Sequence, residues 1–247
     1  MVTRLPVRRA LIAGLVLLLA VPAMGTAGRW QTHFKATFNN VSAPAHGSSG
    51  NTLSLVPAEV GYFETNAPPE AFTVEQDGPG QGHLTFASVG APEDWVLRAV
   101  LVPPFTGDDV YGSMNVTPGN EIKIDFIDDN DTPLIDVGFL PGGDIDIDGN
   151  EIDLQWEPGV DYLVTFHFSN PTMGMARYTL TISQALDPTS TAPTMNPSQT
   201  VSGPLHLNGG PVTLTAVDFV VPEGSGFGNV EIDNVKVLSQ IVGITQL

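Results

Sequence analysis

The sequence of 247 residues contains no cysteine. This absence excludes disulfides, thiolate metal sites, iron–sulfur clusters and cysteine nucleophiles. Basic residues are also scarce, because 9 Lys and Arg stand against 27 Asp and Glu and give a formal net charge of −18. Such a surface would repel the phosphates of a nucleic acid, so we expect no nucleic-acid partner. No G-x-S-x-G, P-loop or dinucleotide-binding motif occurs, and we assign no catalytic residue.

Residues 1–25 have the features of a cleaved signal peptide. Three arginines precede an apolar run at 10–21, and small residues follow it as a cleavage site. The run is shorter than the roughly 20 residues that a membrane-spanning helix needs. Cleavage after Gly25 would leave a chain with a formal charge of −21 and no membrane span. Since no lipid-bearing cysteine follows the run, we expect a Sec-type route to a secreted or periplasmic location.

The rest of the sequence alternates apolar and polar residues with a period of two. Ile122, Ile124 and Phe126, for example, are separated by Lys123 and Asp125. Similar runs occur at 34–38, 135–139, 163–168, 178–182 and 230–235. Such alternation is typical of half-buried strands, and no apolar stripe with a helical period competes with it. We therefore predict an all-β fold, a two-sheet antiparallel β-sandwich of jelly-roll type.

A single β-sandwich domain over residues 26–247 is the expected domain organisation. The segment 184–204 is rich in Ser, Thr and Pro and predicts a long surface loop within it. Too few residues follow this segment to build a second domain of ordinary size.

Four stretches carry a resemblance to a known family: "EIKIDFIDDNDTPLIDVGF", "GVDYLVTFHFSN", "ARYTLTIS" and "NVEIDNVKVLS". Their succession resembles secreted bacterial concanavalin A-like (laminin-G-like) jelly-roll domains of lectins and glucanases. The resemblance implies that the last strand pairs with an N-terminal strand at 34–38. It also implies a tendency to bind glycans, whereas the fold alone fixes no activity.

Acidic residues concentrate between residues 121 and 156. The pattern predicts a four-stranded meander whose acidic turns, at 128–132 and 149–150, lie at the same end of a sheet. Alternation places many carboxylates on one sheet face, namely Glu121, Asp125, Asp136, Asp144, Asp146, Asp148, Glu151 and Asp153. These charges would repel one another unless water or cations separate them.

Three interpretations of this acidic face remain open. In the first, Asp144, Asp146, Asp148 and Asn150 hold Ca²⁺ through hard oxygen ligands, although the bidentate Glu and flanking helices of an EF-hand are missing. In the second, the Asp144–Asp153 face serves a glycoside hydrolase. In the third, the acidity only keeps a structural surface or matrix protein soluble.

The hydrolase interpretation meets two obstacles. The "EIDLQ" stretch at 151–155 resembles the E-x-D-x-E pattern of a jelly-roll glucanase family, but Gln155 cannot act as an acid or base. Asp144 and Asp148 would lie about 13 Å apart at their Cα atoms. Retaining hydrolysis needs carboxyl groups about 5–5.5 Å apart.

The leading hypothesis is an exported, non-catalytic binding module for carbohydrate or another cell-surface component, with Ca²⁺ as a candidate cofactor. Because jelly-roll binders use loops and open faces, the candidate ligand contacts are Trp95, Tyr111, Asp128, Asp129 and Asp131. His167 stands between Phe166 and Phe168 and is expected as a packed or rim histidine on the opposite strand face.

Overall fold

The structure is a computed structural model that describes residues 29–38, 51–52, 58–68, 71–78, 81–88, 92–170, 175–184, 197–205, 207, 211–226 and 228–241. The predicted signal peptide lies outside these residues. Within them the chain forms strands β1 to β16 and no α-helix. No helix in this part of the chain is therefore long and apolar enough to cross a membrane.

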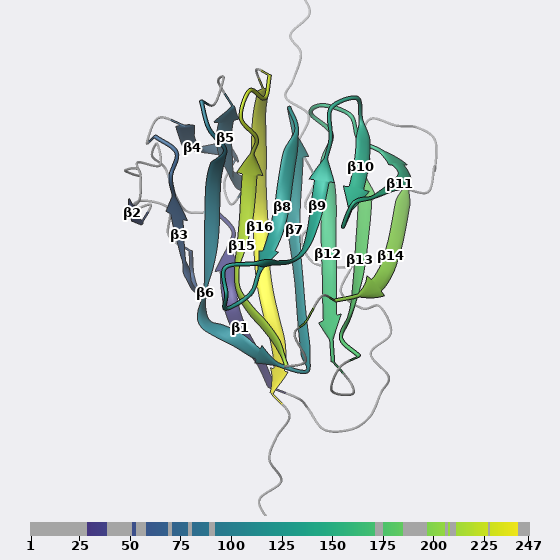
Figure 1. Cartoon of the computed structure of the whole chain (residues 1–247). Helices are drawn as coiled ribbons and strands as arrows, with labels where there is room; N and C mark the ends of the chain where they lie inside the picture. The colour runs from purple at the N-terminus through teal and green to yellow at the C-terminus, as the bar shows by residue number, and fades with distance from the viewer. Residues whose placement is uncertain are drawn as a thin grey trace, which may run out of the picture.

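Two antiparallel sheets lie face to face (Figure 1). In order, sheet A contains β14 (Ser198–Pro204), β13 (Arg177–Gln184), β12 (Tyr162–Ser169), β7 (Asp109–Pro118), β16 (Gly228–Ile241), β5 (Gln81–Ser88) and β4 (Phe72–Gly78), with β1 (Arg29–Ala36) also paired to β16. In order, sheet B contains β11 (Asn150–Gln155), β10 (Asp144–Ile147), β9 (Pro133–Phe139), β8 (Ile122–Ile127), β15 (Val212–Val221), β6 (Trp95–Gly107), β3 (Tyr62–Thr65) and β2 (Asn51–Thr52). The predicted β-sandwich is confirmed.

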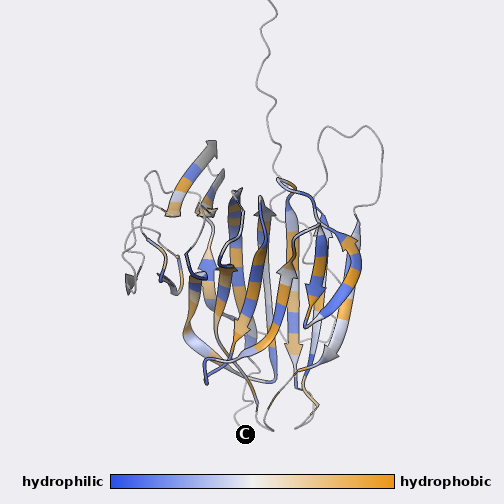
Figure 2. Ribbon diagram, turned by 45° about the horizontal axis from the view of Figure 1, so that its top comes forward, coloured by the Kyte–Doolittle hydropathy of each residue, from blue (hydrophilic) through white to orange (hydrophobic). Residues whose placement is uncertain are grey.

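Apolar and polar residues alternate along most strands (Figure 2), and the buried apolar residues of both sheets form one core. Phe126 of sheet B packs against Phe166 and Phe168 of sheet A, with ring centroids 4.6 and 5.1 Å apart. Each buried aromatic side chain of this kind contributes about 1.5–3 kcal/mol. The meander of β8 to β11 follows the predicted alternation, with Ile145 and Ile147 fully buried.

The N-terminal strand pairs with the C-terminal one, as the family resemblance implies. Phe34 of β1 is the register partner of Val237 of β16. His33 joins β1 to sheet B, since its Nδ1 donates to the Pro103 carbonyl oxygen at 2.8 Å and its Nε2 lies 2.8 Å from the Ser239 hydroxyl. A carbonyl only accepts, so Nδ1 carries the proton. These contacts fix the strand that bears Trp30.

The prediction of a loop over residues 184–204 is wrong at both ends of this segment. Gln184 ends β13, and Ser198–Pro204 forms the edge strand β14, while residues 185–196 lie outside the described part of the chain. Because this strand has few large apolar residues, the alternation of apolar and polar residues does not predict it. It is held by cross-strand hydroxyl pairs as well as by the backbone ladder: Thr179–Ser202 at 3.0 Å, Thr181–Thr200 at 2.8 Å and Ser183–Ser198 at 2.9 Å.

Candidate functional site

The outer face of sheet B carries a row of charged residues in register, which we call the charged ladder. Arg98 of β6 lies opposite both Glu64 of β3 and Asp218 of β15. Asp125 of β8 in turn lies opposite Asp218 and Asp136 of β9. The predicted grouping of Asp125 and Asp136 on one face is confirmed, and the ladder continues it onto strands far away in the sequence.

Arg98 neutralises one end of the ladder. Its Nε and Nη2 donate to the two carboxylate oxygens of Asp218, each at 2.8 Å, and Nη2 also lies 2.7 Å from Asp131. The hydrogen bond to Asp218 is the main reason that the pKa of Arg98 is raised. Burial raises the pKa of Asp218, although Arg98 opposes this effect. The guanidinium and its two acids are a fixed structural unit.

Lys123 neutralises the other end. Its Nζ lies 3.1 Å from Asp125 and 3.6 Å from Asp136, so the two carboxylates share one ammonium. Burial lowers the pKa of Lys123, but the two acids outweigh it and leave the pKa raised. Burial raises the pKa of Asp125, against the effect of Lys123 and with help from Asp136 and Asp218. Lys123 thus reduces the repulsion between Asp125 and Asp136.

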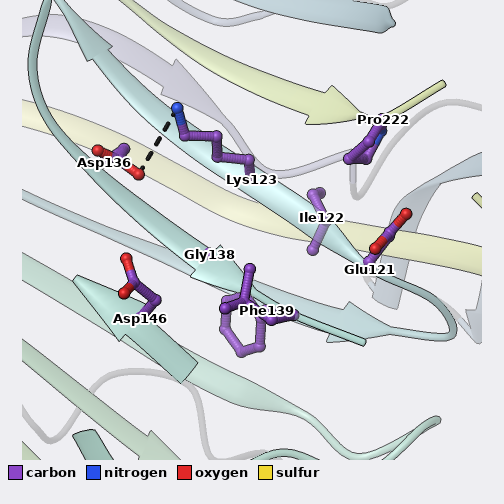
Figure 3. A pocket seen from close by; sticks show the side chains of 9 residues that line it. Glu121, Ile122, Lys123, Asp136, Gly138, Phe139, Asp146 and Pro222 are labelled. Atoms are coloured by element: carbon purple, nitrogen blue, oxygen red, sulfur yellow. Dashed lines mark ion pairs between the residues drawn. The ribbon is translucent and has the colours of Figure 1, made fainter. Parts of the chain in front are cut away.

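A hollow of about 110 Å³ opens beside Lys123 (Figure 3). Asp136 and Asp146 border it from neighbouring strands, and Glu121 stands at its other end. Gly138 lies between them and has no side chain that would fill the hollow. A Cβ at this position would lie 3.0 Å from Leu140. The hollow is small, its surface is almost entirely apolar, and its charged groups stand at the rim.

The two acidic turns lie at the same end of sheet B, as predicted, and hydrogen bonds within each turn hold their side chains. Asp128 accepts hydrogen bonds from the backbone nitrogens of Asn130 and Thr132, at 2.8 and 2.9 Å. In the second turn Asp146 accepts from the nitrogen of Gly149 at 2.9 Å. Asn150 donates to the Asp148 carbonyl oxygen at 2.9 Å. Nowhere in the described residues do three metal-binding side chains converge.

The outer face of sheet A carries a different feature, an aromatic platform of Trp30, Tyr111 and His167. The rings of Tyr111 and His167 are stacked, with centroids 4.1 Å apart and planes 6° from parallel. Trp30 meets Tyr111 edge-on at 5.6 Å and keeps 47% of its surface exposed. Asp109 binds His167, with its Oδ1 2.7 Å from the Nε2 of the imidazole.

The register of four strands builds this platform. Tyr111 of β7 lies directly opposite His167 of β12 on one side and Leu238 of β16 on the other. Trp30 enters from β1, opposite Gln240 of β16. Burial and, to a smaller extent, the Asp109 charge raise the pKa of Tyr111. The hydroxyl pairs of β13 and β14 extend the same face beyond His167.

The structure separates the residues predicted as ligand contacts. Trp95 is not available for binding, because it is 8% exposed and stacks on Phe86 in the core at 6.4 Å. Tyr111 belongs to the aromatic platform, whereas Asp128, Asp129 and Asp131 lie in the β8–β9 turn of the opposite sheet. Trp30 was missed, since only the pairing of distant strands brings it to Tyr111.

Comparison with known proteins supports the fold. No family model matches the sequence, and no curated protein matches it. The PL-14 alginate lyase from Aplysia kurodai shares the fold with 8% identity and a TM-score of 0.56, over 84% of this chain and 98% of the lyase. A sialidase aligns at 16% identity and a TM-score of 0.50, over 81% of this chain. The chain spans only 19% of that sialidase.

These likenesses and the sheet topology define the fold of the chain. The chain is a jelly-roll β-sandwich of the concanavalin A-like type.

Proposed function

We propose that the protein is a carbohydrate-binding module that holds its ligand on the aromatic platform of sheet A. The observation that carries the proposal is the exposed Trp30 ring set edge-on against the Tyr111–His167 stack. A contiguous group of exposed apolar rings bordered by polar residues marks a binding face on many soluble domains. A sugar ring offers an apolar C–H face to such rings and hydroxyls to the polar groups beside them.

The polar surroundings of the platform suit a hydroxyl-rich ligand. Asp109 and His167 offer an acceptor and a ring nitrogen at one side. Thr179 lies opposite His167, and Ser202 follows on the next strand. Strands lie about 4.8 Å apart, so the platform and the hydroxyls together form a track several sugar units long. The fold neighbour that is an alginate lyase shows that this fold can serve polysaccharides. In line with the predicted signal peptide, we propose that the module acts outside the cytoplasm.

Affinity electrophoresis in gels containing polysaccharides tests this proposal. Trp30→Ala and Tyr111→Ala should each weaken binding about tenfold or more, which corresponds to about 1.4 kcal/mol. Tyr62→Ala is the matched control, because Tyr62 is 38% exposed but lies on sheet B. Equal retardation of the wild type and of Trp30→Ala by every polymer would contradict the proposal.

A second candidate function is hydrolysis at the charged ladder. Its support is Asp125, whose pKa is raised by burial, paired with a second carboxylate on the same ammonium. Two carboxyl groups in different environments are the usual acid and base of glycoside hydrolysis. This candidate moves the predicted centre from the Asp144–Asp153 face to Asp125 and Asp136. Release of reducing sugar that Asp125→Asn abolishes would support it, and release that Asp125→Asn leaves unchanged would contradict it.

A further inference from the structure

The few cations of this acidic chain are distributed unevenly. Arg98 and Lys123 are neutralised by acids on sheet B. Lys35, Arg177 and Lys236 belong to β1, β13 and β16 of sheet A. Within the described residues, no carboxylate lies at ion-pair distance from Arg177 or Lys236, whereas Lys35 lies 3.6 Å from Glu59. With 27 acidic residues in the chain, it is unexpected that no acid among the described residues pairs with these two cations or with Arg29 of β1.

The two cations flank the aromatic platform. Lys236 is the register partner of Ser113, which stands two residues beyond Tyr111 on the same strand face. Arg177 is the partner of Ser169, two residues beyond His167. Such diagonal neighbours have Cβ atoms about 7–8 Å apart, within reach of long side chains. The Tyr111–His167 stack therefore lies between a lysine and an arginine.

A further relationship points the same way. Lys35 and Lys236 are direct register partners across β1 and β16, and like charges in that position destabilise a sheet. Glu59 relieves only Lys35, through an exposed ion pair that contributes little. Of the charged groups facing the platform, Asp109 is already bound to His167. An anion on this face would offset the repulsion that the chain leaves in place.

We infer that the ligand of the aromatic platform is an acidic polysaccharide, whose anionic groups pair with Lys236 and Arg177 while a sugar ring stacks on Trp30. The inference rests on the proposed function and adds the charge of the ligand to it. A guanidinium and an ammonium are the groups that bind carboxylate or sulfate most strongly. The overall charge of −18 repels a polyanion. At 0.15 M salt that repulsion is screened beyond about 8 Å.

Two matched pairs of polymers test the inference at 0.15 M salt. The first pair is polygalacturonate and its fully methyl-esterified form, and the second is dextran sulfate and dextran. We expect at least tenfold tighter binding of the charged member of one pair, and that pair identifies the anionic group. Lys236→Gln and Arg177→Gln should each reduce this preference severalfold, because they weaken the binding of the charged member more than that of the neutral member. Trp30→Ala should weaken both members.

The outcomes separate the two proposals. Equal binding of charged and neutral members, with loss in Trp30→Ala, would overturn the acidic ligand and leave carbohydrate binding intact. A charge preference that Lys236→Gln and Arg177→Gln both leave unchanged would also overturn it. Binding that Trp30→Ala does not alter, or no binding of any of the four polymers, would overturn both.

Discussion

Tyr111 and His167 lie face to face across β7 and β12, with ring centroids 4.1 Å apart. The two residues are 56 positions apart in the printed sequence and meet only because their strands are neighbours in sheet A. Asp109, two residues before Tyr111 on β7, holds Nε2 of the imidazole, so His167 cannot turn without breaking a contact. A rigid pair of this kind costs little entropy when a ligand stacks beside it.

Removal of Arg98 should destabilise the protein strongly. Arg98→Met leaves Asp218, which is 5% exposed, as a buried charge without its partner. Breaking such a buried pair costs about 3 kcal/mol. Urea unfolding would measure this loss, and the double variant Arg98→Met/Asp218→Leu should recover most of it. A loss below about 0.5 kcal/mol in the single variant would show that the pair behaves like an exposed one.

The pKa of Asp125 gives the stability a defined pH dependence. Burial raises this pKa, so the folded protein holds the proton more tightly than the unfolded chain does. The contribution of Asp125 is therefore fully present below its ordinary pKa of 3.8 and is lost as the pH rises through the folded value.

Asp125→Asn should accordingly have a higher Tm than the wild type at pH 7, and the difference should shrink at pH 3. Thermal unfolding of both proteins at the two pH values measures this effect, with Asp146→Asn as the control on the same face. A lower Tm of Asp125→Asn at pH 7 would show that the Lys123 pair outweighs the burial of the charge.

His33 should link the stability of the sandwich to the position of the platform. His33→Ala leaves the Ser239 hydroxyl and the Pro103 carbonyl without their partner, and a buried group left so costs about 1–3 kcal/mol. Because β1 carries Trp30, the variant should also weaken polysaccharide binding. Hydrogen exchange would show faster opening of β1, and unchanged exchange there would contradict this role.

Calcium binding by the β10–β11 hairpin stays a prediction. The carboxylate of Asp146 already accepts a turn hydrogen bond, and the described residues gather no set of ligands. We therefore expect a Tm change below 1 °C between excess Ca²⁺ and EDTA. A specific site would instead stabilise by about 2.7 kcal/mol at a hundredfold excess over Kd. A Ca²⁺-dependent rise in Tm that disappears in Asp146→Asn would establish the site.

Much of the fold could be predicted from local patterns. Strands β8 to β11 are joined by short turns, so alternation alone fixed which residues, such as Ile145 and Asp146, face the core and the solvent. Even the pairing of Phe34 with the last strand followed from a family resemblance.

The site could not be predicted in the same way, because it depends on long-range register. Trp95 was predicted as a ligand contact because jelly-roll binders use loops and open faces, yet its strand begins with an inward position. Trp30 lies near the start of the described residues. It reaches Tyr111 only because β1 pairs with β16 and β16 pairs with β7, far along the sequence. In strand β14, paired hydroxyl groups stand in place of the apolar residues from which a strand is predicted.

The most direct test of the account is the affinity of the wild type, Trp30→Ala and Tyr62→Ala for polysaccharides, measured by titration calorimetry after the gel screen has identified a polymer that binds. We predict at least a tenfold loss for Trp30→Ala and no change for Tyr62→Ala, since the two exposed aromatic residues lie on opposite sheets. Loss of binding in Tyr62→Ala with none in Trp30→Ala would place the binding face on sheet B and contradict the account.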